Sequence, residues 1–297
     1  LYGPVALSLV FSILGQNLDI ILIYRTPGGP GQNAVSFASA QTLIQFPVGL
    51  VAVALSLAVL PALTAAANVG DGAEFKRTLR LGFRLGLLLM IPAMVGIEVL
   101  SAPIMRLLFQ HGSCAAGCTE RNVLAIFNMS YQLPFIALDQ LLIAAFYARK
   151  NTLVPMLVGI ASIVCYAAVA VPLAPVLGLP GIAFANTVQN SSHAIILFVL
   201  LTLTIGSLGL RDLGGGLLRI GVAAAGMAAT CWGLLVALPL LAPGLFTPNH
   251  LTGELLTVLV AGGLGGAVYF ALAALLRVEE VRMLGGLARA RLGGGRR

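Results

Sequence analysis

Charged residues are scarce in this sequence: Asp, Glu, Lys and Arg make up 9% of its 297 residues, against about 25% in an average soluble domain. Hydrophobic residues make up 59%, and the mean hydropathy is +1.01. This balance excludes an ordinary soluble domain. It predicts a chain that lies in a lipid bilayer.

Enzyme fingerprints are also missing. The sequence contains no GxSxG nucleophile motif, no HExxH zinc motif, no P-loop and no dinucleotide-binding glycine pattern. We therefore expect no catalysis. Any function is expected to rest on polar residues inside the apolar runs.

Cysteine is rare, with four residues in the chain. Cys165 and Cys231 lie inside apolar runs and are interpreted as small core residues. Cys114 and Cys118 share the segment HGSCAAGCTER, where an oxidising compartment permits a disulfide, and the sequence leaves that pairing open. His111 lies nearby, but no second ligand cluster exists to complete a tetrahedral metal site, so none is expected.

Long apolar runs are abundant. A window of about 20 apolar residues, the length needed to cross a hydrocarbon core about 30 Å thick, identifies about eight spans. Proline inside three of them, Pro47, Pro92 and Pro134, predicts kinked or broken helices. The sequence thus predicts an all-α integral membrane protein with helices at residues 4–24, 34–63, 81–102, 123–147, 153–174, 181–206, 217–241 and 253–276.

Basic residues are distributed unequally between the predicted loops. With the first span starting in the cytoplasm, only Arg25, Arg106 and Arg121 fall on the outer side. The positive-inside rule then places both ends in the cytoplasm, including a basic tail at residues 277–297. This topology and anionic lipid headgroups explain the net charge of +7 without a nucleic-acid partner. The predicted cytoplasmic residues are Lys76, Arg77, Arg80, Arg84, Arg149, Lys150, Arg211, Arg219, Arg277, Arg282, Arg289, Arg291, Arg296 and Arg297.

The chain begins with Leu1, and its first apolar run carries Gln16, Asn17 and Asp19 without a preceding basic segment. This pattern differs from that of a signal peptide. We expect an N-terminal part of a longer protein to precede it.

Polar residues recur at helical spacing inside four of the predicted spans. Offsets of three, four and seven residues place such residues on one face of a helix. A carboxylate at the centre of a membrane helix costs about 2.5–3.5 kcal/mol by insertion scales, so Asp19 and Asp139 are expected to line a hydrated cavity. For the amides, hydrogen bonds between packed helices are the alternative. The stripes are Gln16 and Asp19; Gln41 and Gln45; Asn128, Gln132 and Asp139; and Asn186, Asn190 and His193.

Small residues are spaced as GxxxG at Gly82 and Gly86, and again at Gly262 and Gly266. Such pairs let helices approach closely. We expect them to pack helices within one chain rather than to form a dimer face.

Landmarks along the chain resemble a known family. The segments are QFPVGLVAVALSLAVLPALT, LRLGFRLGLLLMIPAMVGIEVLSAPIMRLLFQHGSC, FYARKNTLVP and LGLPGIAFANTV. In order and spacing they resemble the lipid II flippase family MurJ, also called MviN, of the multidrug/oligosaccharidyl-lipid/polysaccharide exporter superfamily. The last two predicted helices resemble the two extra C-terminal helices of that family.

The resemblance implies two six-helix lobes that face each other across a central cavity. Residues 1–206 would form the C-terminal lobe, and residues 207–276 an extra helix pair with a groove for a lipid tail. The implied activity is translocation of lipid II, the undecaprenyl-diphosphate-linked peptidoglycan precursor, across the bacterial cytoplasmic membrane by alternating access. The implied partners are this lipid-linked saccharide, membrane lipids and an N-terminal lobe of the same protein.

Three positions depart from the family pattern. Family members typically read Ala-Asp-Arg-Leu where this chain has Ala40-Gln41-Thr42-Leu43, and they often have arginine where it has Ala144. Electrostatic capture of the diphosphate is therefore expected from the other lobe.

The resemblance also implies a coupling-cation site, for Na⁺ or H⁺. Asp19 falls at the position of a family aspartate that helps to bind such a cation. Tyr166 and Ala170 stand where further polar partners would be expected, which leaves Asn186 and Thr187 as the other candidates.

The remaining polar residues are candidates for the substrate cavity, and among them Asp139 matches no family residue. Two alternative functions stay open. One is an exporter of another lipid-linked oligosaccharide or polysaccharide; the other is a non-transporting scaffold, whose polar stripes would be tied up between helices. An ion channel is disfavoured because no ring of charge or carbonyl filter is visible. The cavity candidates are Gln41, Thr42, Gln45, Asn128, Gln132, Asp139, Asn190 and His193.

Overall fold

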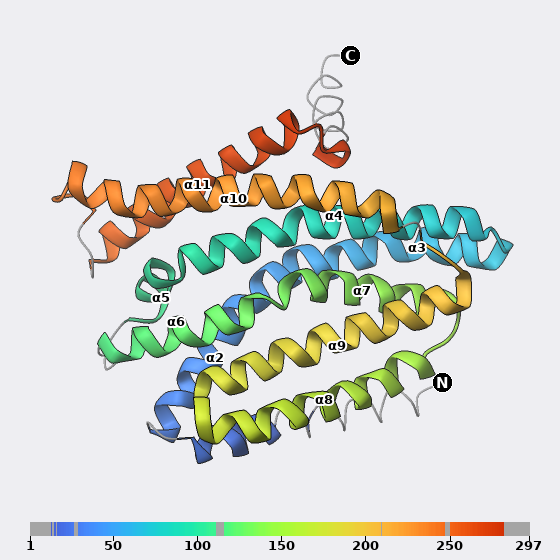
Figure 1. Cartoon of the computed structure of the whole chain (residues 1–297), viewed down its shortest axis with the longest axis horizontal. Coiled ribbons are helices and arrows are strands. Elements are labelled where there is room, and N and C mark those ends of the chain that lie inside the picture. Colours follow the sequence, from blue (N-terminus) through green and yellow to red (C-terminus); the bar gives the residue numbers. More distant parts are fainter. Residues whose placement is uncertain are drawn as a thin grey trace.

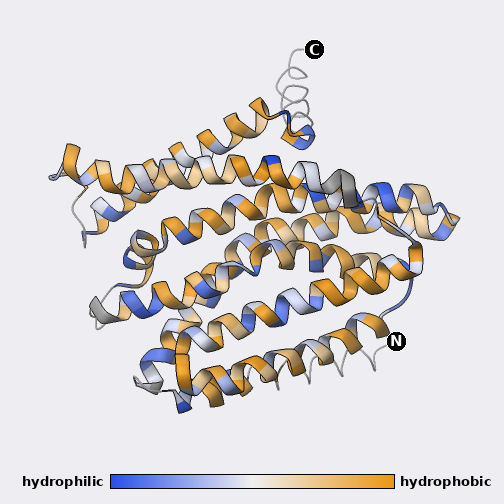
Figure 2. Ribbon diagram, in the orientation of Figure 1, coloured by the Kyte–Doolittle hydropathy of each residue, from blue (hydrophilic) through white to orange (hydrophobic). Residues whose placement is uncertain are grey.

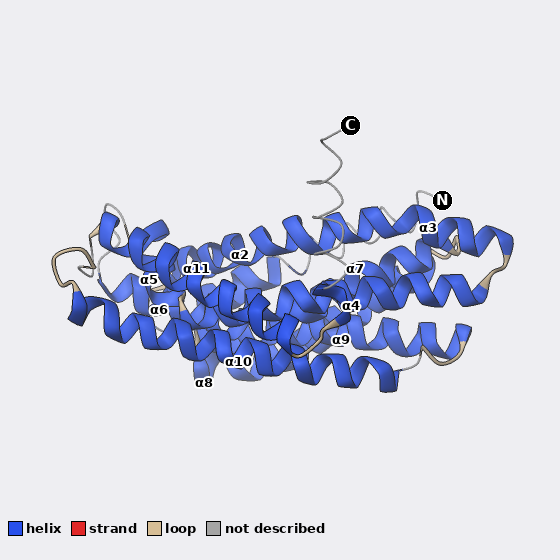
Figure 3. Ribbon diagram, turned by 90° about the horizontal axis from the view of Figure 1, so that it is seen from above, coloured by secondary structure: helices blue, strands red, loops and turns tan. Residues whose placement is uncertain are grey.

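A computed structural model describes residues 13, 15, 17–26, 29–110, 116–208, 210–246 and 250–281. In that part of the chain all regular structure is helical (Figure 1, Figure 3), so the predicted all-α class is confirmed. Residues 17–25 form the first described helical segment. The elements that follow are α2 (Pro30–Pro47), the π-helical segment η1 (Val48–Val53), α3 (Ala54–Val69), α4 (Gly72–Val99), α5 (Ser101–Phe109), α6 (Ala116–Ser130), α7 (Leu133–Ala148), α8 (Leu153–Leu177), α9 (Leu179–Ile205), α10 (Leu210–Leu241) and α11 (Leu251–Leu275).

Six stretches within the described residues are long and apolar enough to cross a membrane, or seven if the bent pair α6–α7 counts as one span. They follow the predicted spans in order from residue 34 onward. The first of the six, which matches the predicted span 34–63, is longer than predicted and runs from Gly31 to Val69 through α2, η1 and α3. Hydrophobic residues dominate the helices, and hydrophilic residues gather most densely at their ends (Figure 2). The first predicted span, residues 4–24, and the basic tail from residue 282 lie largely outside the described residues.

Two of the three predicted proline kinks coincide with breaks in the helices. Pro47 is the last residue of α2, where the backbone enters the π-helical segment Val48–Val53. Pro134 lies in the first turn of α7, after a bend of 46° between α6 and α7. Pro92 differs, because α4 continues past it to its end at Val99.

The α6–α7 break leaves backbone carbonyls at the end of α6 without their usual helical donors. Thr187 Oγ1 of α9 donates to the Asn128 carbonyl oxygen at 2.6 Å. The backbone N–H of Gln132 donates to the Met129 carbonyl oxygen at 3.3 Å. Because an unsatisfied backbone group in lipid costs several kcal/mol, these bonds allow the helix to bend at membrane depth.

Helices that are distant in sequence lie side by side (Figure 1). Two hairpins, α8–α9 and α10–α11, flank a central group made of α3, α4 and α7. In that group α4 packs against α7 on one side and α10 on the other, while α9 packs against α7 and α2 packs against α6. The described residues form three apolar cores, one around α2, α6 and α9, one around α3, α4 and α7, and one between α4 and the α10–α11 hairpin.

The α10–α11 hairpin is joined to the preceding helices at both of its ends. Arg106 of α5 forms an ion pair with the buried Glu254 of α11. At the other end, Arg84 of α4 lies 3.3 Å from the carboxylate of Glu280, just after α11. Between these points the buried Tyr269 hydroxyl donates to a backbone carbonyl of α4 at 2.6 Å. These three contacts hold the hairpin firmly against α4 and α5.

The first GxxxG pair packs two helices of the same chain, as predicted. A Cβ atom on Gly82 would lie 3.1 Å from Leu141, and one on Gly86 would lie 3.3 Å from Ala137. Both glycines therefore allow close contact between α4 and α7.

The second GxxxG pair is not the point of closest approach between α10 and α11. A Cβ on Gly262 would lie 3.4 Å from Leu100, and Gly266 has nothing within 4 Å. The closest contacts are made instead at Gly265 of α11, where a Cβ would overlap the Sγ atom of Cys231, and at Gly226 of α10, where a Cβ would overlap Leu272.

Alanine at Gly265 is expected to destabilise the protein, because its Cβ would overlap Cys231 Sγ in a packed interface. Overpacking of this kind typically costs about 1–3 kcal/mol. Gly266→Ala is the matched control, since the same change one residue along α11 meets open space. Thermal unfolding in detergent measures both variants. Equal unfolding midpoints would contradict a close contact at Gly265.

Candidate functional site

A polar cavity of 260 Å³ lies between the helices near the α6–α7 break. Its walls come from the N-terminal helical segment, α2, the break itself, α8 and α9. The apolar lining includes Ile44, Met129, Ile136 and Ile163. The polar lining residues are Asp19, Gln41, Gln45, Gln132, Asn186, Gln189 and Asn190.

Polar residues from four predicted stripes therefore meet at one place. Each polar lining residue except Gln189 is a candidate taken from the sequence. Gln189 lies three residues after Asn186, so the same helical spacing places it on that face of α9. The role of these residues in transport stays a prediction.

A hydrogen bond between two amides holds the centre of the cavity wall together. Asn190 Nδ2 of α9 donates to Gln132 Oε1 at the α6–α7 break, at 2.6 Å. The same nitrogen lies 3.0 Å from the Asn186 carbonyl oxygen one turn earlier. Gln132 is buried. The side chain of Gln132, at the break, is thus held against α9 by Asn190.

Asp19 is buried in the cavity wall, where its carboxylate accepts a hydrogen bond from the hydroxyl of Tyr166. Tyr166 lies on α8 and is itself fully buried. The sequence placed Tyr166 where a polar partner of the aspartate was expected, and its hydroxyl provides that partner. Asp19 is also one of the residues that line the cavity.

Three other candidates form bonds away from the cavity. Thr42 is exposed, and its hydroxyl donates to the Ala38 carbonyl oxygen of its own helix at 2.8 Å. Asn128 Nδ2 donates to the Leu124 carbonyl oxygen at 2.8 Å. Thr187 is buried, and its hydroxyl is used at the α6–α7 break.

Asp139 and His193 form a pair of their own. His193 Nδ1 lies 2.5 Å from Asp139 Oδ1, and His193 Nε2 lies 3.4 Å from the Pro155 carbonyl oxygen. Neither residue lines the polar cavity. Asp139 follows Gln132 by seven residues, which is about 10 Å along α7, so the pair joins α7, α9 and the start of α8 beyond the cavity.

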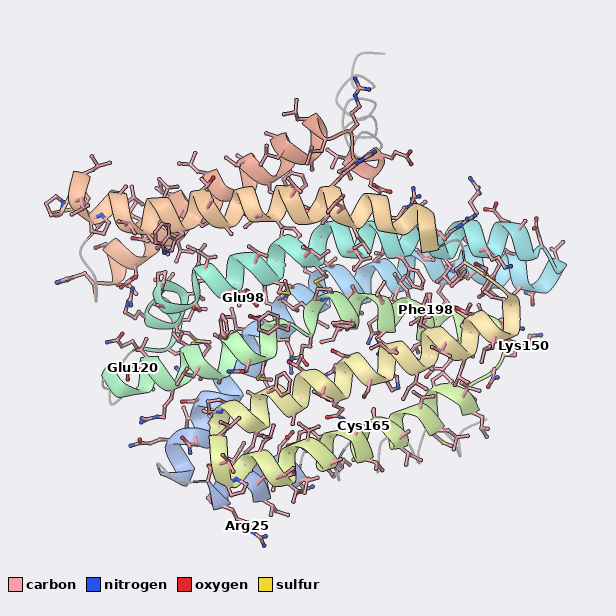
Figure 4. The ribbon with its side chains drawn as sticks, in the orientation of Figure 1. Arg25, Glu98, Glu120, Lys150, Cys165 and Phe198 are labelled. Carbon is pink, nitrogen blue, oxygen red and sulfur yellow. The ribbon has the colours of Figure 1, made fainter. Side chains whose placement is uncertain are left out.

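Glu98 is a membrane-embedded carboxylate that the polar stripes did not include. It lies at the end of α4 (Figure 4), where Ser130 Oγ donates to its Oε1 at 2.9 Å. The sequence signal is one acidic residue in the apolar run MVGIEVL. A lone charge has no spacing pattern, so the stripe argument passed over it.

The cavity lining carries one formally charged side chain, Asp19, and no Lys or Arg among the described residues. Gln41, which stands where the family pattern has aspartate, lines the wall. Ala144, which stands where family members often have arginine, is buried. The described residues contain no cluster of three or more metal-ligating side chains. This wall therefore offers hydrogen bonds and one negative charge.

Of the two cysteines that were expected to be core residues, one is buried and the other is partly exposed. Cys231 is buried against α11, and Cys165 is half-buried on α8. Cys118 is disulfide-bonded. Cys114 and His111 lie outside the described residues.

The protein-family model described as lipid II flippase MurJ matches residues 30–260. The probable lipid II flippase MurJ of Rhizobium meliloti (strain 1021) is 33% identical over 275 residues, covering 90% of this chain and 50% of the relative. The corresponding protein of Bdellovibrio bacteriovorus is 28% identical over 246 residues, covering 82% and 45%. The chain thus spans about half the length of these relatives.

Solved structures agree on the fold. A lipid II flippase MurJ in an inward closed conformation superimposes with a TM-score of 0.72 at 19% identity, covering 92% of this chain and 52% of that one. A transporter of the MOP superfamily from Pyrococcus furiosus gives a TM-score of 0.51 at 14% identity, covering 94% and 65%.

Removal of the Tyr166 hydroxyl is expected to destabilise the protein, because it leaves the buried Asp19 without that donor. Hydrogen bonds to charged groups contribute about 1.5–3 kcal/mol. The variants are Tyr166→Phe and, as a control, Tyr147→Phe, whose side chain is 46% exposed. Unfolding midpoints in detergent measure the effect. A Tyr166→Phe midpoint equal to that of the control would argue against the Asp19 contact.

Asp139 and His193 are expected to be energetically coupled. Breaking a buried pair leaves one group unpaired, at a typical cost of about 3–5 kcal/mol. Asp139→Leu and His193→Leu should each lower the unfolding midpoint strongly, and the double variant should lose less than the sum of the two. The measurement is a double-mutant cycle. Strictly additive losses would show that the two side chains do not interact.

Proposed function

This chain belongs to the lipid II flippase MurJ family, and we propose that it forms the C-terminal six-helix lobe and the following helix pair of a flippase. The proposed cargo is undecaprenyl-diphosphate-linked peptidoglycan precursor, which crosses the bacterial cytoplasmic membrane without any bond being made or broken. The observation that carries the proposal is the polar cavity, which collects amide and carboxylate side chains from four helical segments inside the bundle.

The proposed mechanism is alternating access. Two lobes rock against each other, the polar headgroup crosses between them, and the prenyl tail stays in lipid. The cavity of 260 Å³ is small beside the roughly 300–1,000 Å³ of ordinary ligand pockets. It therefore represents one wall of a larger site that an opposing lobe would complete.

Amides suit the saccharide and peptide parts of such a headgroup, because they both donate and accept hydrogen bonds. Gln41, Gln45, Gln189 and Asn186 line the cavity and would face these groups. The wall has no cation for the diphosphate. We assign that role to the part of the protein that the relatives have and this chain does not span.

Ion pairs at both ends of the α10–α11 hairpin support motion of this chain as one body. Arg106–Glu254 and Arg84–Glu280 join the hairpin to α5 and α4. Rocking would then occur at the face of the lobe that carries the polar cavity. The hairpin would travel with that lobe and guide the lipid tail.

The coupling cation is proposed to bind at Asp19. The carboxylate faces the cavity beside Asn186, and Tyr166 fixes its orientation. Oxygen ligands of this kind suit Na⁺, and a carboxylate alone suffices for H⁺. Thr187 is not included among the proposed cation ligands, because its hydroxyl donates to the Asn128 carbonyl oxygen at the α6–α7 break.

The proposed topology places the C-terminus in the cytoplasm. Lys76, Arg80, Arg149 and Lys150 lie together around one cavity at one end of the bundle, while Arg25 lies at the other end (Figure 4). A concentration of basic residues at one end is what the positive-inside rule expects of the cytoplasmic side.

Export of another lipid-linked oligosaccharide is the second candidate. The cation-free cavity wall favours such a cargo where its link to the lipid carries less negative charge than a diphosphate, because Asp19 repels negative charge. A non-transporting scaffold is supported less well, since its polar stripes would be consumed between helices and the cavity here keeps seven polar lining residues.

Complementation tests the proposal. The chain, joined to the N-terminal half of the Rhizobium meliloti relative, is expected to rescue cells depleted of their own lipid II flippase. Asp19→Asn should reduce rescue at equal membrane abundance, because losing a coupling energy of about 1–3 kcal/mol changes an equilibrium about 5–150-fold. Colony counts after depletion measure the effect.

Thr64→Val is the control, since that hydroxyl donates to the Leu60 carbonyl oxygen of its own helix at 2.8 Å and Thr64 does not line the polar cavity. The complete Rhizobium meliloti relative serves as the positive control for rescue. Full rescue by Asp19→Asn would remove the coupling role. Failure of a well-expressed wild-type chimera beside a working positive control would favour a different lipid-linked cargo.

A further inference from the structure

A second, larger cavity lies at the far end of α9 from the polar cavity. Its volume is 930 Å³, within the range of small-molecule sites. The α3–α4 turn, the first turns of α4, the α7–α8 turn and the end of α9 surround it. Lys150 marks this end of the bundle in Figure 4.

Four basic side chains line this cavity: Lys76, Arg80, Arg149 and Lys150. None of them forms an ion pair with a described residue. Asp71 is the acidic residue in the lining, and its carboxylate is occupied as the cap of α4, accepting from two backbone N–H groups at 3.1 Å and 2.9 Å. The cavity therefore holds an excess of positive charge that the described residues do not neutralise.

The position of Lys150 is unusual for its residue type. Lys150 has a φ of 58° and follows the C-cap of α7. Its N–H donates to the Tyr147 carbonyl oxygen at 2.9 Å, and the next N–H donates to Phe146 at 3.0 Å. Glycine is the preferred residue at this left-handed position, and other residues cost about 1 kcal/mol more. A lysine here sacrifices turn stability and places a cation at the mouth of the cavity.

We propose that this basic cavity is a binding site for a phosphate group. Phosphate matches the site because its negative charge would balance that of the four cations, and because its several oxygens accept hydrogen bonds from their N–H groups. Two sources are chemically possible, the headgroup of an anionic phospholipid and a soluble phosphate compound. The site is separate from the polar cavity, and the proposal does not depend on which cargo the protein carries.

The end of the helical bundle favours a site that meets the membrane surface. Basic residues next to anionic headgroups gain about 1 kcal/mol each, which is about a fivefold change in affinity. A lipid headgroup bound here would contact α4, α7 and α9 together. It would thereby tie the turns that join these helices at one end of the lobe.

Glycine at position 150 provides a sharp test, because it removes one cation and relieves the turn at the same time. Lys150→Gly should leave the unfolding midpoint equal to or above that of the wild type while weakening phosphate binding about fivefold. The double variant Lys150→Gly/Arg149→Gln should weaken it about 25-fold, because both cations line the cavity.

Arg277→Gly is the matched control. Arg277 also has a φ of 58° and the same turn, in which its N–H donates to Ala274 at 3.1 Å and the next N–H donates to Ala273 at 2.9 Å. It does not line the basic cavity. The two glycine variants therefore remove one positive charge and relieve the same turn. They differ in whether the lost charge lines the basic cavity.

Native mass spectrometry of the full chain in a non-ionic detergent, titrated with phosphatidylglycerol, measures the bound lipid. Phosphatidylcholine is the lipid without net charge, and inorganic pyrophosphate is the soluble competitor. Retention of phosphatidylglycerol that pyrophosphate does not displace would identify a lipid headgroup site. Displacement by pyrophosphate would identify a site for soluble phosphates as well.

Two results would overturn the proposal. One is equal loss of binding in Lys150→Gly and Arg277→Gly, which would reduce the effect to general surface charge. The other is a wild-type chain, shown to be folded by a cooperative unfolding transition, that retains neither phosphatidylglycerol nor pyrophosphate above the phosphatidylcholine level.

Discussion

The bend between α6 and α7 is the constraint on which the rest of this lobe depends. Lipid cannot hydrogen-bond the carbonyls that a broken helix frees, so the break has to lie where protein can reach them. Thr187 of α9 reaches one such carbonyl, and Asn190 one turn later holds the side chain of Gln132. The register between α6–α7 and α9 is thereby fixed. The polar cavity forms beside this junction because the groups that repair the break also bring amides to it.

The same requirement governs four acidic side chains of the described helices. Asp19 is held by Tyr166, Asp139 by His193, Glu98 by Ser130 and Glu254 by Arg106. Each pair joins two different helices. A polar residue in lipid thus acts as a link between helices before it does anything else. Asp19 lines the polar cavity as well as forming its link, and for this reason we propose it as the carboxylate that takes part in transport.

Helical periodicity and hydropathy were sufficient to predict the fold, because a membrane span is a property of consecutive residues. The spacing of Gln132, at the α6–α7 break, and of Asn186 and Asn190 on α9 also predicted the face on which the cavity lies. Periodicity could not tell how far along a helix the cavity extends, so Asp139 and His193 were grouped with it. It also could not distinguish a hydroxyl that faces solvent from one that closes a helix break, as Thr187 does. Those distinctions depend on the partner helix, which no local pattern contains.

The two cavities differ in the charge of their lining. The polar cavity carries a single negative charge, and the basic cavity at the end of α9 carries four positive side chains. A phosphate is attracted to the second region and repelled by the first. A cargo with a phosphate would therefore have to be accompanied through the polar cavity by cations from elsewhere, either from an opposing lobe or bound at Asp19. Binding of a coupling cation at Asp19 would remove the repulsion at the moment of passage. In such a transporter the coupling ion and the cargo would share one electrostatic field, which links their movements without any direct contact between them.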